Sequence, residues 1–219
     1  MKEYLFLHIP KCAGSSVHAL LPDRRWNNFT IHRRSQFTLN QDSFAYENGY
    51  ESKPHHYSLE QHTKINVCSP EDFNSAYKFS FVRNPFDRMV STYHYSLDTS
   101  DEWKGISFED FLSRAERIIR NESLYRKHGP IQPNHLVPQC KYIYAPSGEK
   151  IVDFCGRVEN FDSDIRHVFE QIGLPAPEII PRSNITPGRK SYKEYYNEES
   201  IRLVEDLYEA DLGYFNYAY

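Results

Sequence analysis

The sequence predicts an α/β domain with a central, mainly parallel sheet flanked by helices in three layers. Two short runs of apolar, strand-forming residues, Tyr4–Ile9 and Tyr77–Val82, each lead through a polar loop into a helical pattern. Strand–loop–helix units of this kind build parallel sheets that are covered by helices. The 219 residues suffice for one sizeable core, so we expect a single domain over residues 1–219.

The first unit ends in a loop that suits an anion. Pro10–Ser16 is small and polar, and Val17–Leu21 is typical of a helix start with Ser15 or Ser16 near its N-cap. Such a turn presents backbone N–H groups and the positive end of a helix dipole, and Lys11 adds a full positive charge. The loop therefore predicts phosphate binding. The alternative is an ordinary turn that contains Lys, Gly and Ser.

The second unit repeats this design. Ser69-Pro70 predicts a helix start, and Arg83–Arg88 is a basic loop that directly follows the second strand. Because parallel strands bring such loops to the same edge of a sheet, we expect the two basic loops to meet. The next helix is expected to run to about Leu97, with an inward face formed by Met89, Val90 and Tyr93.

The rest of the chain alternates between regular elements and irregular loops. Ser107 predicts the N-cap of a helix to about Asn121, and Gly173 predicts the end of a helix that begins at Asn160 or Asp162. The other expected elements are strands at 140–144 and 151–154, a last helix at 198–208, a Pro-rich linker at 175–190, and substrate loops at 24–52 and 122–138.

The composition argues against two classes of protein. Lys and Arg total 26 against 30 Asp and Glu, so the chain lacks the basic footprint of a nucleic-acid binder. No apolar run approaches the length of a membrane-spanning helix, and no signal peptide precedes Tyr4. We therefore expect a cytoplasmic protein with no transmembrane segment and no nucleic-acid partner.

The cysteines and histidines do not predict a metal site. The four cysteines are widely scattered without paired spacing, which indicates reduced thiols. Cys12 lies in the first loop, where a helix N-terminus would lower its pKa, although a catalytic thiol is the less favoured interpretation. His55, His56 and His62 lack the i, i+4 spacing of a helical zinc site, and one of them is a candidate general base.

The order of residues in the first loop argues against a triphosphate site. A triphosphate-binding loop has its lysine directly after the second glycine, whereas Lys11 precedes Gly14. No strand supplies a clear acidic ligand for the Mg²⁺ of an ATP- or GTP-dependent enzyme. Two separate basic loops fit better with a nucleotide that has two distant monophosphates.

Two longer stretches show a specific resemblance. His8–Ser16 and Phe79–Tyr93 resemble the two nucleotide-binding signatures of sulfotransferases that use 3′-phosphoadenosine 5′-phosphosulfate (PAPS). In particular they resemble the carbohydrate-type branch, which includes the chondroitin 4-O- and heparan 2-O-sulfotransferases and short bacterial relatives. Residues 17–52 show no such resemblance. Further similar blocks are Pro138-Gln139, Val152–Asn160, Tyr195-Tyr196 and Tyr208–Phe215.

The resemblance implies a P-loop-like fold and a role for each of several residues. Lys11 would stabilise the bridging oxygen of the leaving phosphate, and His56, or else His55, would take the proton of the acceptor hydroxyl. Arg83 and Ser91 would bind the 3′-phosphate. The remaining implied cofactor contacts come from Cys12, Ala13, Gly14, Ser15 and Ser16 around the 5′-phosphosulfate, and from Arg189 and Lys190 closing over the cofactor.

Four further residues receive structural or secondary assignments. Arg157 and Glu159 are expected to form a structural pair, and His8 is expected to be part of the packed interior. His135 is kept as a candidate on the substrate side.

The implied function is transfer of a sulfuryl group from the co-substrate PAPS, without a metal, to a hydroxyl of a carbohydrate or glycosylated metabolite. The eukaryotic relatives have a membrane anchor, which is lacking here, and this favours a soluble, bacterial-type cytoplasmic enzyme with a small-molecule or glycan acceptor. A homodimer is compatible with the sequence. Two alternatives remain: a nucleotide-dependent kinase of related fold, and a non-catalytic nucleotide- or glycan-binding module.

Overall fold

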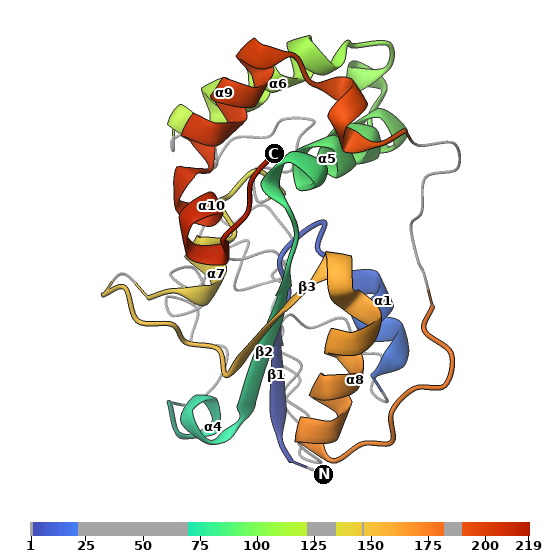
Figure 1. Ribbon diagram of the computed structural model, residues 1–219, viewed down its shortest axis with the longest axis vertical. Coiled ribbons are helices and arrows are strands. Elements are labelled where there is room, and N and C mark those ends of the chain that lie inside the picture. Colours follow the sequence, from blue (N-terminus) through green and yellow to red (C-terminus); the bar gives the residue numbers. More distant parts are fainter. Residues whose placement is uncertain (1, 22–69, 122–134, 146, 182–189) are drawn as a thin grey trace, which may run out of the picture.

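The structure is a computed structural model that describes residues 2–21, 70–121, 135–145, 147–181 and 190–219 (Figure 1). The described sheet consists of three parallel strands in the order β1 (Tyr4–Leu7), β2 (Tyr77–Val82) and β3 (Phe154–Arg157). The predicted α/β class with a parallel sheet is confirmed. Because β1 and β2 are parallel neighbours, the loops that follow them leave the sheet at the same edge.

Two helices cover one face of this sheet. Phe6 and Phe79 lie side by side on β1 and β2, and their stacked rings have centroids 5.1 Å apart. The Phe6 ring meets His18 of α1 (Gly14–Leu20) at 5.4 Å, and Phe81 meets Phe161 of α8 (Phe161–Ile172) at 4.9 Å. Phe79 and Phe81 are two residues apart on one strand, so they share a face. The predicted three-layer arrangement and P-loop-like fold stay predictions.

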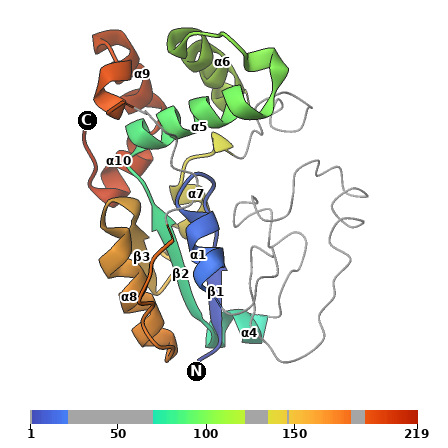
Figure 2. The ribbon, with the colours of Figure 1, turned by 90° about the vertical axis from the view of Figure 1, so that its right-hand side faces the viewer.

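A second group of helices lies beyond the carboxyl edge of the sheet (Figures 1 and 2). Its apolar cluster includes Phe86, Val90, Phe111 and Val204, all fully buried. The helices of this group are α5 (Pro85–Thr99), η2 (Asp101–Trp103), α6 (Phe108–Arg120), η6 (Tyr192–Tyr195) and α9 (Glu198–Leu207).

Local capping residues explain why several boundaries were predictable. The Ser107 hydroxyl accepts a hydrogen bond from the Asp110 N–H at the start of α6, as an N-cap does. The last residue of α8 is followed by Gly173 at φ 74°, a left-handed conformation that suits glycine. The short helix α4 (Pro70–Ser75) begins at the predicted proline.

The expected strand at 140–144 is wrong. Cys140–Ile143 forms a short helix, α7, and the chain resumes as a strand at Phe154 instead of Ile151. Asp211 is the cause, because its carboxylate accepts the N–H groups of Gln139 (2.7 Å) and Cys140 (2.8 Å) and so caps α7 from 71 residues away. Asp211 itself lies on α10 (Glu209–Phe215), a helix that was not predicted, because the last expected helix ended at residue 208.

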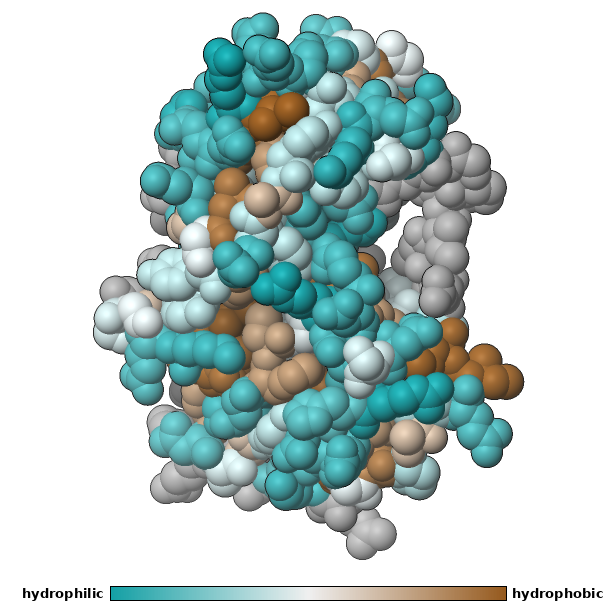
Figure 3. Space-filling model, viewed as in Figure 1, coloured by the Kyte–Doolittle hydropathy of each residue, from teal (hydrophilic) through white to brown (hydrophobic). Residues whose placement is uncertain are grey.

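The visible surface is mainly hydrophilic, and apolar groups form separate clusters on the face drawn in Figure 3. Ile179 and Tyr214 are the exposed large apolar side chains of the described ranges, at 82% and 52%. None of the described helices has the length and hydropathy of a membrane span.

Candidate active site

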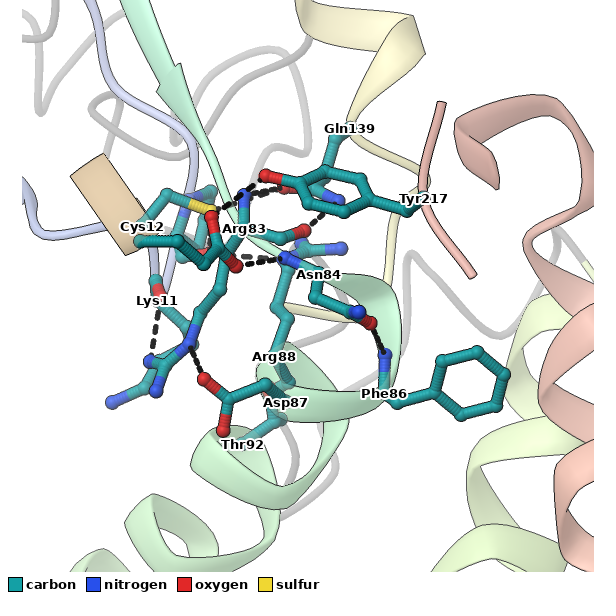
Figure 4. A network of polar contacts seen from close by, with 12 residues as sticks. Lys11, Cys12, Arg83, Asn84, Phe86, Asp87, Arg88, Thr92, Gln139 and Tyr217 are labelled. Carbon is teal, nitrogen blue, oxygen red and sulfur yellow. Dashed lines mark hydrogen bonds and ion pairs between the residues drawn. The ribbon is translucent and has the colours of Figure 1, made fainter. Parts of the chain in front are cut away.

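The two basic loops meet at the carboxyl edge of the sheet, as the parallel arrangement predicted. Arg83 follows β2 directly, and its Nη1 donates a hydrogen bond to the backbone carbonyl of Lys11 at 3.3 Å (Figure 4). The guanidinium of one loop therefore holds the main chain of the other. The two cationic residues are therefore neighbours at this edge of the sheet.

The first loop has an unusual backbone. Lys11 and Ala13 both adopt left-handed conformations, with φ angles of 67° and 60°. Residues in this region of φ/ψ space cost about 1–3 kcal/mol each unless glycine occupies them, and such strain concentrates at functional sites. Alternation of left- and right-handed residues turns successive N–H groups into one concavity that suits an anion.

The helix after this loop begins earlier than predicted. Its N-cap is Ala13, and the Ser16 N–H donates to the Ala13 carbonyl at 2.9 Å. The expectation of Ser15 or Ser16 as N-cap is therefore wrong. The left-handed turn at Ala13 lets the chain enter the helix directly, so Ser15 and Ser16 lie in its first turn. Their position leaves the amide-rich end of α1 next to Lys11.

Gly14 is required by close packing. A Cβ atom at this position would lie 1.9 Å from Nε2 of His8. The His8 ring stacks on Phe6 at 5.6 Å and meets His18 at 5.6 Å, which agrees with the expected packing role of His8. His18 is buried, and this burial lowers its pKa. The start of α1 therefore packs closely against the end of β1.

The Lys11 ammonium lies over an aromatic ring that sequence reasoning missed. Its Nζ is 4.1 Å from the ring centroid of Tyr95 on α5, within cation–π distance. The other partner of this ring is His135, which is 4% exposed and lies 4.9 Å away. The signal for Tyr95 was its position four residues after Ser91, because such residues share one helix face.

Arg83 is oriented by a carboxylate of the same loop. Its Nε donates to Asp87 at 2.7 Å, and the two side chains are only 15% and 23% exposed (Figure 4). Asp87 and Ser91 are four residues apart on α5, so both face the side of the helix on which Arg83 lies. Sequence reasoning identified Arg83 and Ser91 but missed the orienting role of Asp87.

The expected lowering of the Cys12 pKa is wrong. The thiol is 1% exposed and donates to Gln139 Oε1 at 3.2 Å, and the Cys12 N–H donates to the Ile9 carbonyl. Burial raises the pKa of Cys12 to about 12, despite the opposing charges of Arg88 and Arg83. Loss of hydration on burial disfavours the thiolate, and this effect outweighs the stabilisation of the thiolate by the nearby positive charges. In the structure, Cys12 is a buried, hydrogen-bonded side chain of the core.

Below the loops lies a buried polar group that the sequence patterns did not single out. Arg88 of α5 is 2% exposed, and it donates from Nε to the Pro10 carbonyl (3.1 Å) and from Nη1 to the Val137 carbonyl (2.9 Å). Asp211 is fully buried, and burial raises its pKa against the opposing effects of Arg88 and of the backbone N–H donors. The resembling blocks Phe79–Tyr93, Pro138-Gln139 and Tyr208–Phe215 include these residues, but no role was predicted for Arg88 or Asp211.

Arg157 and Glu159 do not pair with each other in the described structure. Arg157 donates to the Phe215 carbonyl and lies 4.6 Å from the centroid of the Tyr217 ring. Glu159 accepts from the Asn84 N–H at 2.7 Å and from the Tyr217 hydroxyl at 2.8 Å. Arg157 thus joins the C-terminal segment to β3, and Glu159 joins it to the second loop, which corrects the expectation of a direct pair.

Some predicted site residues lie outside the described residues. These are the base candidates His55 and His56, and Arg189. Lys190 is described and exposed. Within the described ranges, no group of three or more His, Cys, Asp or Glu side chains is arranged to hold a metal ion.

Comparisons with known proteins indicate the family. The family model described as "Sulfotransferase family" matches residues 2–218. A protein of Archaeoglobus fulgidus named "Uncharacterized protein" is 30% identical over 122 residues, which cover 56% of this chain and 87% of that protein. No solved structure matches the chain.

Proposed function

The chain belongs to the sulfotransferase family, and on that premise we propose that it transfers a sulfuryl group from PAPS to a hydroxyl of a carbohydrate or glycosylated metabolite. The observation that supports this most directly is the junction of the two basic loops, where Arg83 Nη1 bonds to the Lys11 carbonyl. PAPS has phosphates on both the 3′ and the 5′ side of its ribose. Two adjacent cationic loops match that pair of anions.

The first loop is proposed to hold the 5′-phosphosulfate. Its left-handed residues and the start of α1 offer backbone N–H donors, and Lys11 supplies the positive charge. Cys12 would contribute only through its position in the loop, because its side chain is buried. Ala13, Gly14, Ser15 and Ser16 would surround the phosphosulfate.

The second loop is proposed to hold the 3′-phosphate. Arg83 is already oriented by Asp87, and Ser91 lies on the same side of α5. A guanidinium whose rotamer is held in advance loses less entropy when an anion binds. Lys190, together with Arg189, is proposed to close over the nucleotide.

The proposed reaction is an in-line displacement at sulfur. The acceptor oxygen forms a bond to sulfur while the bond from sulfur to the bridging oxygen of the 5′-phosphate breaks. The electron pair of the broken bond stays on that oxygen, where Lys11 neutralises the developing charge. His56, with His55 as the alternative, takes the proton of the acceptor hydroxyl. No metal is part of this scheme.

The ring of Tyr95 makes a cation–π contact with the Lys11 ammonium. A cation–π contact with an exposed ring is worth about 0.5–1 kcal/mol, and a contact to a phosphate oxygen is stronger. A contact between the Lys11 ammonium and the proposed donor would therefore more than replace its contact with the Tyr95 ring, whose centroid is 4.1 Å away. His135, whose ring centroid lies 4.9 Å from that of Tyr95, stays a candidate on the substrate side.

The donor is tested by calorimetry with 3′,5′-ADP and with ATP plus Mg²⁺. We expect 3′,5′-ADP to bind in the absence of metal and ATP to bind more weakly. A preference for ATP with Mg²⁺ would instead favour a nucleotide-dependent kinase.

Chemistry is tested by transfer of labelled sulfate from PAPS to a panel of sugar and non-sugar hydroxyl acceptors. We expect transfer by the wild type and loss of transfer in Lys11→Ala and His56→Ala. Nucleotide binding without transfer to any acceptor would favour a non-catalytic module. If His55→Ala loses transfer while His56→Ala retains it, the general base is His55 instead of His56. The cytoplasmic location and the homodimer stay predictions.

A further inference from the structure

One buried side chain joins the two loops. Gln139 is 0% exposed, and its Oε1 accepts hydrogen bonds from the Arg83 N–H at 2.9 Å and from the Cys12 thiol at 3.2 Å (Figure 4). Its Nε2 donates to the Arg83 carbonyl at 2.9 Å and to Asp211 at 3.3 Å. The amide thereby uses both acceptor sites and both N–H groups.

These contacts lie between the residues proposed to bind phosphate. Arg83 is the cation of the second loop, and both of its backbone polar groups bond to Gln139. Cys12 stands between Lys11 and Ala13, the two left-handed residues of the first loop. Gln139 therefore contacts the middle of the first loop and the first residue of the second, and it does so from the buried side.

Gln139 is itself held in place by its neighbours. Its backbone N–H donates to Asp211 at 2.7 Å, and Arg88 bonds to the carbonyls of Pro10 and Val137, on either side of the same junction. Buried polar groups that are fully paired are rigid, because each alternative position leaves a donor or acceptor unpaired. The amide is a fixed reference point for both loops.

We infer that Gln139 is a positioning residue that sets the spacing between the 5′-phosphate and 3′-phosphate subsites. This inference rests on the proposed function. A ligand with both phosphates gains affinity from its second phosphate only if the two subsites stand at the matching distance. A ligand with one phosphate needs only one loop, so it does not depend on their spacing.

The test compares three ligands on two matched variants. Gln139→Met keeps the side-chain length and removes the hydrogen bonds, and Gln171→Met makes the same change on α8. Gln171 is a suitable control because the end of α8 lies at the opposite edge of the sheet, where the Lys2 N–H donates to the Ile172 carbonyl. Affinities for 3′,5′-ADP, 5′-AMP and 3′-AMP are measured by calorimetry on all three proteins.

We expect Gln139→Met to weaken the binding of 3′,5′-ADP by about tenfold or more, because the variant loses all four side-chain hydrogen bonds of Gln139, three of which hold Arg83 and Cys12. The affinities for 5′-AMP and 3′-AMP should change by less than about twofold, and Gln171→Met should bind like the wild type. Equal weakening of all three ligands, or no weakening of any, would overturn the inference. If the wild type itself does not bind 3′,5′-ADP, the proposed function fails, and the inference fails with it.

A second variant covers the case in which Gln139→Met does not fold. Gln139→Glu keeps an oxygen that accepts from the Arg83 N–H but has no amide N–H for the Arg83 carbonyl. We expect 3′,5′-ADP to bind this variant more weakly than it binds the wild type, while the affinities for 5′-AMP and 3′-AMP again change by less than about twofold. A uniform change across the three ligands would also overturn the inference.

Discussion

At the scale of single residues, Lys11 combines a strained backbone with a charged side chain at the junction of two loops. Its φ of 67° places its carbonyl where Arg83 Nη1 reaches it, and its ammonium lies over Tyr95. The same residue therefore joins the loops through its main chain and faces the proposed donor through its side chain. These two roles can be separated by substitution, because only the second depends on the ammonium.

Lys11→Ala is expected to lower kcat for sulfuryl transfer by about 10²–10³-fold, the effect of removing one group that stabilises charge in a transition state. The affinity for 3′,5′-ADP should fall by much less, because the backbone donors remain. Labelled-sulfate kinetics and calorimetry on one preparation measure both quantities. Lys104→Ala, which removes an exposed lysine, serves as control. An unchanged kcat in Lys11→Ala would remove Lys11 from the mechanism.

Cys12 shows how burial decides the chemistry of a thiol. With its pKa raised to about 12, the thiolate fraction at pH 8 is about one in 10⁴. We expect Cys12 to resist iodoacetamide in the native protein at pH 8 and to react once the protein is unfolded. Peptide mass spectrometry measures the modification. A modification rate that levels off near neutral pH would contradict the raised pKa, since a plateau marks full ionisation.

At the scale of elements, the C-terminal segment is fastened to the start of α5. The Tyr217 hydroxyl donates to Glu159, which also accepts from the Asn84 N–H, and the Asn84 amide donates to the Ala218 carbonyl. Asn84 is the N-cap of α5. Helix α5, which carries Ser91 and Tyr95, is therefore held at its N-terminus by contacts with the C-terminal segment.

Tyr217→Phe is expected to lower the free energy of unfolding by about 1 kcal/mol, the net worth of one hydrogen bond. Tyr214→Phe alters an exposed tyrosine of the same region and should change stability by less than about 0.5 kcal/mol. Urea unfolding followed by fluorescence measures both values. Equal effects of the two substitutions would show that the Glu159 contact adds nothing.

The same tyrosine predicts a pH effect. Burial, followed by the charge of Glu159, raises the pKa of Tyr217 above the ordinary value of 10.0. Since the folded state holds this proton more tightly than the unfolded state, the contribution is complete below pH 10 and is lost as the pH rises above it. Wild type should therefore lose stability above pH 10 more steeply than Tyr217→Phe.

The elements also show where sequence patterns suffice. Strand β2, the start of α4 and helices α5, α6 and α8 were predictable because their signals are local: an apolar run, a capping serine, a proline or a terminal glycine. Helix α7 was not, since its cap is Asp211 of α10. Because this carboxylate is so distant in the sequence, the residues that it caps contain no signal that predicts the helix.

At the scale of the whole molecule, the proposed site lies between two apolar clusters. One surrounds the sheet and includes Cys12, and the other surrounds α5, α6 and α9. Sequence patterns predicted the meeting of the loops, because it follows from parallel strands. They could not predict that Cys12 would face the interior, since this depends on Gln139, 127 residues away.

A ligand at this junction should stabilise both clusters. At 100 times its dissociation constant, 3′,5′-ADP should add about 2.7 kcal/mol to the free energy of unfolding. For a chain of this size, that corresponds to a rise in Tm of about 5–10 °C. Thermal unfolding with increasing ligand measures the shift, and 5′-AMP at the same concentration is the control. Equal shifts for both nucleotides would argue against a separate 3′-phosphate subsite.

The capping of α7 by Asp211 also sets an order of events during protein synthesis. Gln139 and its partner Asp211 are 72 residues apart. At about 5–20 residues per second, a ribosome takes about 4–14 s to add that length of chain. During this interval the nascent polypeptide already contains both basic loops but lacks the carboxylate that anchors Gln139. The proposed nucleotide site therefore reaches its final form only after Asp211 has been added.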